Sequence, residues 1–248
     1  MSELHSTTLP PRPMSVWSYF LDVDGTLVDL AATPDDVCFD ESLLRELESL
    51  RKSTDGAFAI VSGRTIADLD RLFGAAQVSI AGQHGLERRA ADGRTRSPVS
   101  KPKEQAMFHT SLIQSLGNHE RLIVEDKGFS IAVHYRQVPE QYRFLMDTLE
   151  HLVKESRGTI GLLHGKFVVE AVPQGVGKGF AIIDYLNEAP FRGRRPVFIG
   201  DDITDEHAFA VVNRLDGISI KVGDGSSCAA FRLPSVAAVR EWLGKVRL

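Results

Sequence analysis

The chain has 248 residues, of which 43% are hydrophobic and 25% charged, and its formal net charge is −4. This is an ordinary globular composition with no basic stripe, so nucleic acid is not an expected partner. The two cysteines, Cys38 and Cys228, are too far apart in the sequence to form a metal-ligand motif. Buried thiols are therefore the default expectation for both.

The first 15 residues contain three prolines and lack the apolar core of a signal peptide. We expect residues 1–15 to be a disordered N-terminal segment. No apolar run in the sequence approaches the roughly 20 residues that cross a bilayer. The sequence therefore predicts a cytoplasmic protein with no membrane partner.

The next part of the chain alternates between apolar runs and amphipathic segments. The apolar runs at 16–21, 57–61 and 78–81 predict buried strands. Helices are predicted after Asp40 and Thr65, because both residue types cap helices and both precede apolar residues at helical spacing. This alternation is typical of a parallel sheet covered by helices.

The pattern changes beyond Pro98 and Pro102. Four elements are predicted there: helices at 103–116 and 140–155, and hairpins at 121–135 and 159–172. Two helices and four antiparallel strands form a unit of a different type from the preceding alternation. We therefore predict an inserted α+β cap domain at 102–172, bounded by proline-containing hinges.

Alternation of helices and strands returns after the cap. A helix is predicted from Lys178, strands at 196–199 and 217–222, and a last helix near the C-terminus. The predicted fold class is α/β, with a Rossmann-like parallel-sheet core made of 16–101 and 173–248. The cap, two helices on a four-stranded antiparallel sheet, is inserted between these two parts.

Two acids separated by one residue follow the first predicted strand. Alternate residues of a strand lie on one side, so Asp22 and Asp24 would project together from its carboxyl end, where open α/β sheets bind ligands. Gly25 permits a sharp turn, and Thr26 adds a hydroxyl and an amide. Such a pair of acids can hold Mg²⁺ and divide the work of nucleophile and acid/base between its members.

Three further polar groups follow apolar strands or open a helix. They are Ser62 with Arg64, Lys178, and Asp201 with Asp202 and Asp205. Because parallel strands end at one edge of a sheet, these side chains are expected to converge near Asp22. Carboxylates suit a hard metal ion, and an ammonium with helix N-termini suits phosphate oxygens. The set therefore predicts a site for a phosphoryl group bound with Mg²⁺.

A nucleotide-binding loop is excluded for the glycine-rich stretch at 175–179. Val172 stands where a P-loop requires Gly, and Gly179 stands where it requires Ser or Thr. Phe180 fills the last glycine position of the dinucleotide-binding motif. A kinase or a dehydrogenase is therefore not expected.

The motifs D-V-D-G-T at 22–26, Ser62, Lys178 and G-D-D-I-T-D at 200–205 occur in the order typical of the haloacid dehalogenase superfamily of phosphotransferases, which this chain resembles. It further resembles the trehalose-6-phosphate phosphatase family, from about Tyr19 to Leu243. The segments that carry this likeness are S-G-R at 62–64, G-Q-H-G-L-E at 82–87, V-E-D-K-G at 124–128, H-Y-R at 134–136, V-E at 169–170 and G-D-D-I-T-D-E at 200–206. Val23 departs from the Leu or Phe usual in the family.

The resemblance implies catalytic roles for the residues at the sheet edge. Asp22 would attack phosphorus and form an aspartyl-phosphate. Asp24 would protonate the departing sugar 6-oxygen and then deprotonate the water that hydrolyses this intermediate. Thr26, Ser62 and Lys178 would hold the non-bridging phosphate oxygens.

The resemblance also implies a magnesium site. Mg²⁺ would be held by the Asp22 carboxylate, the Asp24 main-chain carbonyl and Asp201. Asp202 would act through a water molecule, and Asp205 would orient Lys178 or one of the metal ligands.

The implied substrate is trehalose 6-phosphate, and its hydrolysis would be the last step of trehalose biosynthesis. The residues implied to contact the sugar are Arg64, His84 and Gly85 in the core, and Glu125, Lys127, Arg136 and Glu170 in the cap. Charged groups suit this role because they make strong, directional hydrogen bonds to neutral sugar hydroxyls. The expected partner is thus a small molecule, and the protein is expected to be a monomer.

Two alternatives stay open. A phosphomutase or another sugar-phosphate phosphatase on the same scaffold is the nearest, although Glu125, Lys127 and the G-Q-H-G-L-E segment favour trehalose 6-phosphate. A catalytically silent sugar-phosphate sensor would require a broken catalytic set, whereas every expected catalytic residue is present.

Overall fold

The computed structural model describes residues 8–31, 37–74, 78–96, 103–117, 119 and 121–246. The chain forms two compact units, Met1–Arg96 with Gly177–Leu248, and Ser97–Val176. The second unit corresponds to the predicted insertion at 102–172, with wider bounds. The prolines expected at the first hinge, Pro98 and Pro102, lie outside the described residues.

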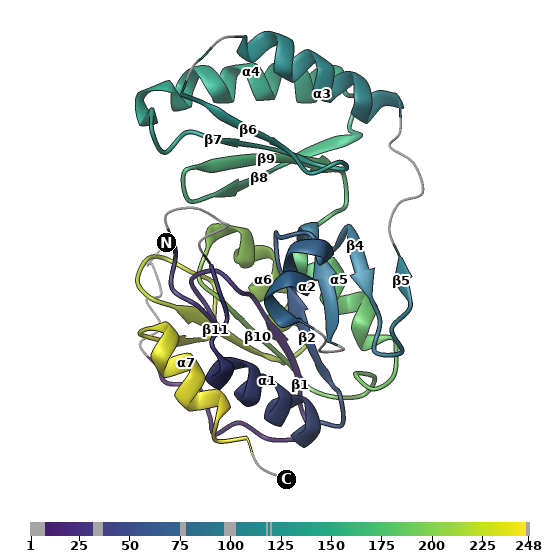
Figure 1. The fold of residues 1–248 in the computed structure, drawn as a ribbon, viewed down its shortest axis with the longest axis vertical. Coiled ribbons are helices and arrows are strands. Elements are labelled where there is room, and N and C mark those ends of the chain that lie inside the picture. Colours follow the sequence, from purple (N-terminus) through teal and green to yellow (C-terminus); the bar gives the residue numbers. More distant parts are fainter. Residues whose placement is uncertain are drawn as a thin grey trace. The chain divides into compact units, whose positions relative to one another are not determined.

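The first unit is built on an eight-stranded sheet in the order β12-β11-β10-β1-β2-β3-β4-β5 (Figure 1). The strands are β1 (Ser18–Leu21), β2 (Phe58–Val61), β3 (Ser79–Gly82), β4 (Glu87–Arg89), β5 (Thr95–Arg96), β10 (Pro196–Gly200), β11 (Ile218–Val222) and β12 (Phe231–Leu233). All neighbouring pairs from β12 to β3 are parallel, and β4 and β5 add an antiparallel edge. This confirms the predicted parallel-sheet core.

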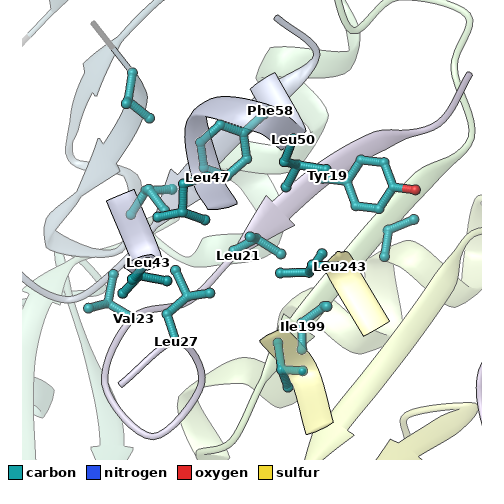
Figure 2. Close-up of a cluster of buried hydrophobic side chains, with 14 of the residues drawn as sticks. Tyr19, Leu21, Val23, Leu27, Leu43, Leu47, Leu50, Phe58, Ile199 and Leu243 are labelled. Carbon is teal, nitrogen blue, oxygen red and sulfur yellow. The ribbon is translucent and has the colours of Figure 1, made fainter. Parts of the chain in front are cut away.

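Helices cover both faces of this sheet. They are α1 (Glu41–Ser53), α2 (Ile66–Phe73), α5 (Lys178–Leu186), α6 (Glu206–Arg214) and α7 (Val236–Leu243). The apolar side chains of α1, α2 and α7 pack into one cluster with Tyr19 and Leu21 of β1, part of which Figure 2 shows. Those of α5 and α6 pack on the opposite face with Phe20. Because successive side chains of a strand alternate in direction, one buried strand supplies both layers.

Two of these helices begin at the residues that the sequence predicts. The Asp40 carboxylate accepts a hydrogen bond from the Leu43 main-chain N–H at 2.6 Å, and the Thr65 hydroxyl accepts one from Asp68 at 3.0 Å. Each cap satisfies a main-chain donor that the first turn of a helix leaves without a partner.

The second unit is a four-stranded antiparallel sheet in the order β6-β7-β9-β8, with two helices. Its elements are α3 (Lys103–Leu116), β6 (Ile123–Asp126), β7 (Ile131–His134), α4 (Tyr142–Glu155), β8 (Ile160–Gly165) and β9 (Val168–Pro173). Alternate residues of β7 and β9 pack with the two helices into a separate apolar cluster. The other face of the sheet carries Glu125, His134 and Glu170, and the register places Ala132 opposite both glutamates.

Two expectations about the chain's periphery need correction. Residues 8–15, expected to be disordered, make defined contacts: Trp242 Nε1 donates to Pro11 O at 2.9 Å and the Tyr19 hydroxyl to Met14 O at 2.8 Å. Both cysteines, expected to be buried, are exposed. They lie in irregular connections, which usually run over a protein's surface. Among the described residues, no helix is both long and apolar enough to cross a membrane.

Candidate active site at the carboxyl edge of the parallel sheet

The predicted site residues of the first unit follow the ends of adjacent parallel strands. Asp22 directly follows β1, Ser62 follows β2 and Asp201 follows β10. β1 lies between β2 and β10, so these three side chains share one edge of the sheet. Lys178 reaches the same edge from the first residue of α5.

The central contact of the site joins Lys178 to two acids. Its Nζ lies 2.8 Å from Asp22 Oδ1 and 2.6 Å from Asp205 Oδ1. All three side chains are buried, and Lys178 is only 3% exposed. Burial alone would lower the pKa of Lys178, but the charges of Asp205 and Asp22 outweigh it and raise that pKa. The lysine therefore stays an ammonium in a place where water cannot compensate its charge.

Two of the acids, Asp22 and Asp201, resist ionisation. Burial raises the pKa of Asp22 well above its ordinary value, although the nearby Lys178 opposes the shift. Burial and the charge of Asp205 raise the pKa of Asp201 to about 7. Crowded carboxylates with raised pKa values are typical of sites that hold a cation.

Asp22, Asp201 and Asp205 each offer a carboxylate oxygen, and these oxygens lie within 4.8 Å of one another. The Oδ1 of Asp201 is buried and makes no hydrogen bond within the part of the chain that the structure describes. Gly25 leaves room for this carboxylate, because a Cβ at that position would overlap it. A hard divalent cation prefers such oxygen ligands, so the residues present fit a divalent metal ion.

The G-D-D-I-T-D segment folds into a tight turn that supplies two of these acids. Asp205 Oδ2 accepts from the Asp202 main-chain N–H at 2.9 Å, and the Asp202 side chain accepts from the Asp205 main-chain N–H. Gly200 is required because a Cβ there would overlap the Asp205 carboxylate. Asp202, predicted as a metal ligand, thus caps the turn, while Asp205 lies in the acid cluster.

Asp24, the predicted acid/base, is held by an arginine. Arg64 binds it through two hydrogen bonds, Nε to Oδ2 at 2.6 Å and a terminal nitrogen to Oδ1 at 2.7 Å. Sequence spacing alone did not indicate this bidentate pair, because it joins residues 40 positions apart through a long side chain. It brings a predicted sugar-binding residue into direct contact with a predicted catalytic one.

Two hydroxyls lie at the same edge. Thr26 is fully buried, and its Oγ1 has no hydrogen-bond partner among the described residues. The Ser62 hydroxyl accepts from the Arg64 main-chain N–H at 3.2 Å. A buried hydroxyl without a partner is unfavourable, so Thr26 is a candidate contact for a bound ligand.

His84 and Gly85 lie in a short turn after β3. The His84 main-chain N–H donates to Ser62 O at 2.9 Å, which ties this turn to the strand end beside it. The His84 ring lies against Gly63, where a Cβ would come within 2.8 Å of its Nε2. His84 has φ of 58°, a left-handed conformation that is uncommon for residues other than glycine. Such strained turns cluster at functional sites.

In the second unit, the structure brings together three of the four predicted sugar-binding residues. Lys127 Nζ lies 3.1 Å from Glu170 Oε2, and Glu125 Oε2 lies 2.9 Å from His134 Nε2. The fourth residue, Arg136, lies beyond the end of β7 and is exposed, with its guanidinium 5.8 Å from the centre of the Phe167 ring.

Sequence reasoning did not single out Ser130, whose hydroxyl donates to Glu170 Oε1 at 2.5 Å. A serine after a hairpin turn carries no signal of its own. Only the register, which places Glu170 beside this strand end, reveals the contact.

The chain matches the model of the trehalose-phosphatase family over residues 20–235. It is 41% identical over 241 residues to the trehalose-6-phosphate phosphatase of Escherichia coli (strain K12), a match that covers 95% of this chain and 88% of that protein. A structure of the C-terminal domain of Candida albicans trehalose-6-phosphate phosphatase has a TM-score of 0.81, with 19% identity and 98% of each chain covered.

The fold also matches a haloacid dehalogenase-like hydrolase from Bacteroides thetaiotaomicron, with a TM-score of 0.65, 14% identity, and coverage of 92% of this chain and 98% of that chain. The family model covers most of the present chain, and the matched region contains both the acid cluster and the inserted antiparallel unit. On these grounds the chain belongs to the trehalose-phosphatase family, on a haloacid dehalogenase-like fold.

Proposed function

We propose that this protein hydrolyses trehalose 6-phosphate to trehalose and inorganic phosphate, the last step of trehalose biosynthesis. The observation that carries the proposal is the buried contact of Lys178 with Asp22 and Asp205 beside the Asp201 carboxylate. It occurs in a chain that is 41% identical to a trehalose-6-phosphate phosphatase.

In this proposal the Asp22 carboxylate attacks phosphorus, and the bond between phosphorus and the sugar 6-oxygen breaks. Asp24 gives a proton to that oxygen, so trehalose leaves and the phosphoryl group stays on Asp22. Asp24 then takes a proton from water, whose oxygen attacks phosphorus and releases phosphate. Arg64 holds the Asp24 carboxylate at the sheet edge, and one of its two hydrogen bonds must open before that oxygen can carry the proton.

The same proposal assigns the metal as Mg²⁺. The Asp22 and Asp201 carboxylates and the Asp24 main-chain carbonyl would hold it, with Asp202 contributing through water. When bound, Mg²⁺ would offset the negative charge that gathers on the phosphoryl oxygens. Asp205 would orient Lys178, as their 2.6 Å contact supports.

Phosphate oxygens would be bound by Lys178, Ser62 and Thr26. The buried Thr26 hydroxyl supports this assignment, since a phosphate oxygen would satisfy it. The N-terminus of α5, which begins at Lys178, adds main-chain donors of the kind that bind anions.

The sugar would be bound by the charged side chains of Glu125, Lys127, Glu170 and Arg136 in the second unit. In the first unit it would be bound by Arg64, His84 and Gly85. The contact of Lys127 with Glu170 supports a built hydrogen-bonding surface rather than two solvated side chains.

Phosphate release from a panel of sugar phosphates, with Mg²⁺ and with a chelator, tests the proposal. We expect trehalose 6-phosphate to be the preferred substrate and the chelator to abolish release. Conversion of a sugar phosphate into its isomer without release would favour the phosphomutase instead. A purified protein that leaves trehalose 6-phosphate untouched at high Mg²⁺ would refute the proposal.

Two finer expectations, a monomer and a cytoplasmic location, stay predictions. Size-exclusion chromatography with light scattering tests the first, and cell fractionation tests the second.

A further inference from the structure

Lys221 is a buried lysine for which the reaction outlined above has no use. It lies in β11, whose residues Ile218, Ile220 and Val222 pack in the apolar cluster on one face of the sheet. Lys221 is only 6% exposed. Lysines are almost never fully buried unless they are paired, because an ammonium loses its hydration there. A neutral side chain would suit this position better unless the ammonium has a specific task.

The ammonium of Lys221 binds the main chain at the metal site. Its Nζ donates to the carbonyl oxygen of Asp201 and, at 3.1 Å, to that of Val222. The register explains the reach: Lys221 lies opposite Gly200, the last residue of β10, and Asp201 follows immediately. Lys221 therefore holds the main chain just after β10, where Asp201 joins the acid cluster.

The Asp201 carboxylate depends on such support. Its Oδ1 makes no hydrogen bond among the described residues, and it lies against the main chain of Gly25. Because the described residues offer Oδ1 no hydrogen bond, the orientation of this carboxylate depends on how its main chain is held.

We propose that Lys221 is a positioning residue for the metal site: it fixes the main chain at Asp201 so that the Asp201 carboxylate is presented to a divalent cation. The inference rests on the proposed function, because it takes Asp201 as a metal ligand. Lys221 would act through the main chain of Asp201 and not on the substrate or the reacting atoms.

Lys221 could affect Mg²⁺ binding in two ways, by repelling the ion or by holding Asp201 in place. The two predict opposite results when Lys221 is replaced. A cation near the site repels Mg²⁺, so at a pH well above 7, where Asp201 is ionised with or without Lys221, repulsion alone predicts that removing Lys221 tightens metal binding. If positioning decides the outcome, removal loosens the Asp201 carboxylate and weakens metal binding. Loss of residues that support metal ligands typically costs about 10- to 100-fold in metal affinity. The proposal commits to the second outcome.

The test measures the Mg²⁺ dissociation constant of the full chain by titration calorimetry, and its thermal midpoint in chelator. Lys221→Met removes the ammonium at nearly equal size, and Lys221→Gln keeps an amide donor without the charge. Ser219→Ala is the matched control: Ser219 is buried two residues away, and its hydroxyl bonds Asn213 Oδ1 at 2.5 Å instead of the metal site. Asp201→Asn reports whether the site itself has been assigned correctly.

We expect Lys221→Met to weaken Mg²⁺ binding by about tenfold or more. Lys221→Gln should weaken it less, and Ser219→Ala should leave it unchanged. The Mg²⁺ concentration for half-maximal activity should rise in Lys221→Met, while kcat at saturating Mg²⁺ stays close to that of the wild type.

Equal or tighter binding in Lys221→Met overturns the proposal, as does loss of the folded state in both Lys221 variants, which would make the role purely structural. If Asp201→Asn binds Mg²⁺ normally, the proposed metal site fails first, and this inference fails with it. Impaired Asp201→Asn together with normal Lys221→Met would refute only the role of Lys221.

Discussion

Catalysis and burial favour opposite protonation states of the Asp22 side chain. It must be ionised to act as a nucleophile, yet burial raises its pKa, and Lys178, 2.8 Å from its Oδ1, opposes that shift and favours the carboxylate. Asp22→Asn keeps the shape and removes the buried charge. We expect it to lower phosphate release by roughly 10³-fold or more, as loss of a nucleophile does elsewhere.

The thermal midpoint of Asp22→Asn should stay equal to or above that of the wild type in chelator, because a neutral amide pays no cost for burying a charge. Near-normal turnover in this variant would rule out Asp22 as the nucleophile. Trapping the wild type, but not the variant, with beryllofluoride would support the assignment.

Gly25 offers a second test at the level of single residues. Its φ of 77° is left-handed, and a Cβ would overlap the Asp201 carboxylate. Gly25→Ala should therefore combine backbone strain of about 1–2 kcal/mol with displacement of Asp201 and weaker Mg²⁺ binding. Gly93 provides the control, since it has φ of 83° and open space where a Cβ would stand.

Gly93→Ala should lose stability to a similar extent through strain but keep the Mg²⁺ affinity of the wild type. Calorimetric titration of both variants with Mg²⁺ separates the effect of backbone strain from that of the overlap with the Asp201 carboxylate. Equal Mg²⁺ affinities in the two would show that the contact between Gly25 and Asp201 has no part in metal binding.

The sequence could predict where most of these residues lie because strand ends fix them. Asp22, Ser62 and Asp201 each follow a run of apolar residues, and a parallel sheet collects such ends at one edge. The pair of Arg64 with Asp24 could not be foreseen, because long side chains choose partners by rotamer and local packing. Lys221 gave a faint signal, a charge inside an apolar strand, that only the register made interpretable.

Among the secondary-structure elements, β6, β7 and β9 carry the test of substrate recognition. Lys127 follows β6 and contacts Glu170 of β9 at 3.1 Å. Lys127→Ala should reduce kcat/KM for trehalose 6-phosphate by about 10- to 100-fold, the equivalent of losing one charged hydrogen bond of about 1.5–3 kcal/mol. A small aryl phosphate, which lacks the sugar, should lose much less.

Lys166→Ala is the control for this variant, because Lys166 is an exposed residue of the turn between β8 and β9. It should behave as the wild type on both substrates. Equal losses on the two substrates in Lys127→Ala would contradict a role in sugar binding and indicate a general disturbance.

The sequence predicted the helices and strands that carry a strong local signal, and it missed a strand that carries none. The caps Asp40 and Thr65 and the buried strands carry strong local signals, and the structure confirms them. β12 has only three residues, too few for any period, and it pairs only because the longer β11 offers it an edge.

For the whole molecule, the acid cluster links stability to pH and to metal. The folded protein holds Asp201 at a pKa of about 7, above its ordinary 3.8, so the folded state binds more protons than the unfolded state between these values. The stabilising contribution is therefore complete below about pH 4 and is lost as pH rises through about 7. The change for one proton is at most about 1.4 kcal/mol per pH unit.

Without metal, the unfolding free energy of the wild type should thus fall between about pH 5 and pH 8, where the acids must ionise without a cation beside them. Asp201→Asn should show a shallower fall. A divalent cation binds the ionised carboxylates of the folded state only, so the gain in thermal midpoint on adding Mg²⁺ should grow with pH over the same interval. Thermal unfolding at several pH values, in chelator and in saturating Mg²⁺, measures both trends. A metal-induced gain that is constant with pH, or equal in the wild type and Asp201→Asn, would show that the buried acids do not form the metal site.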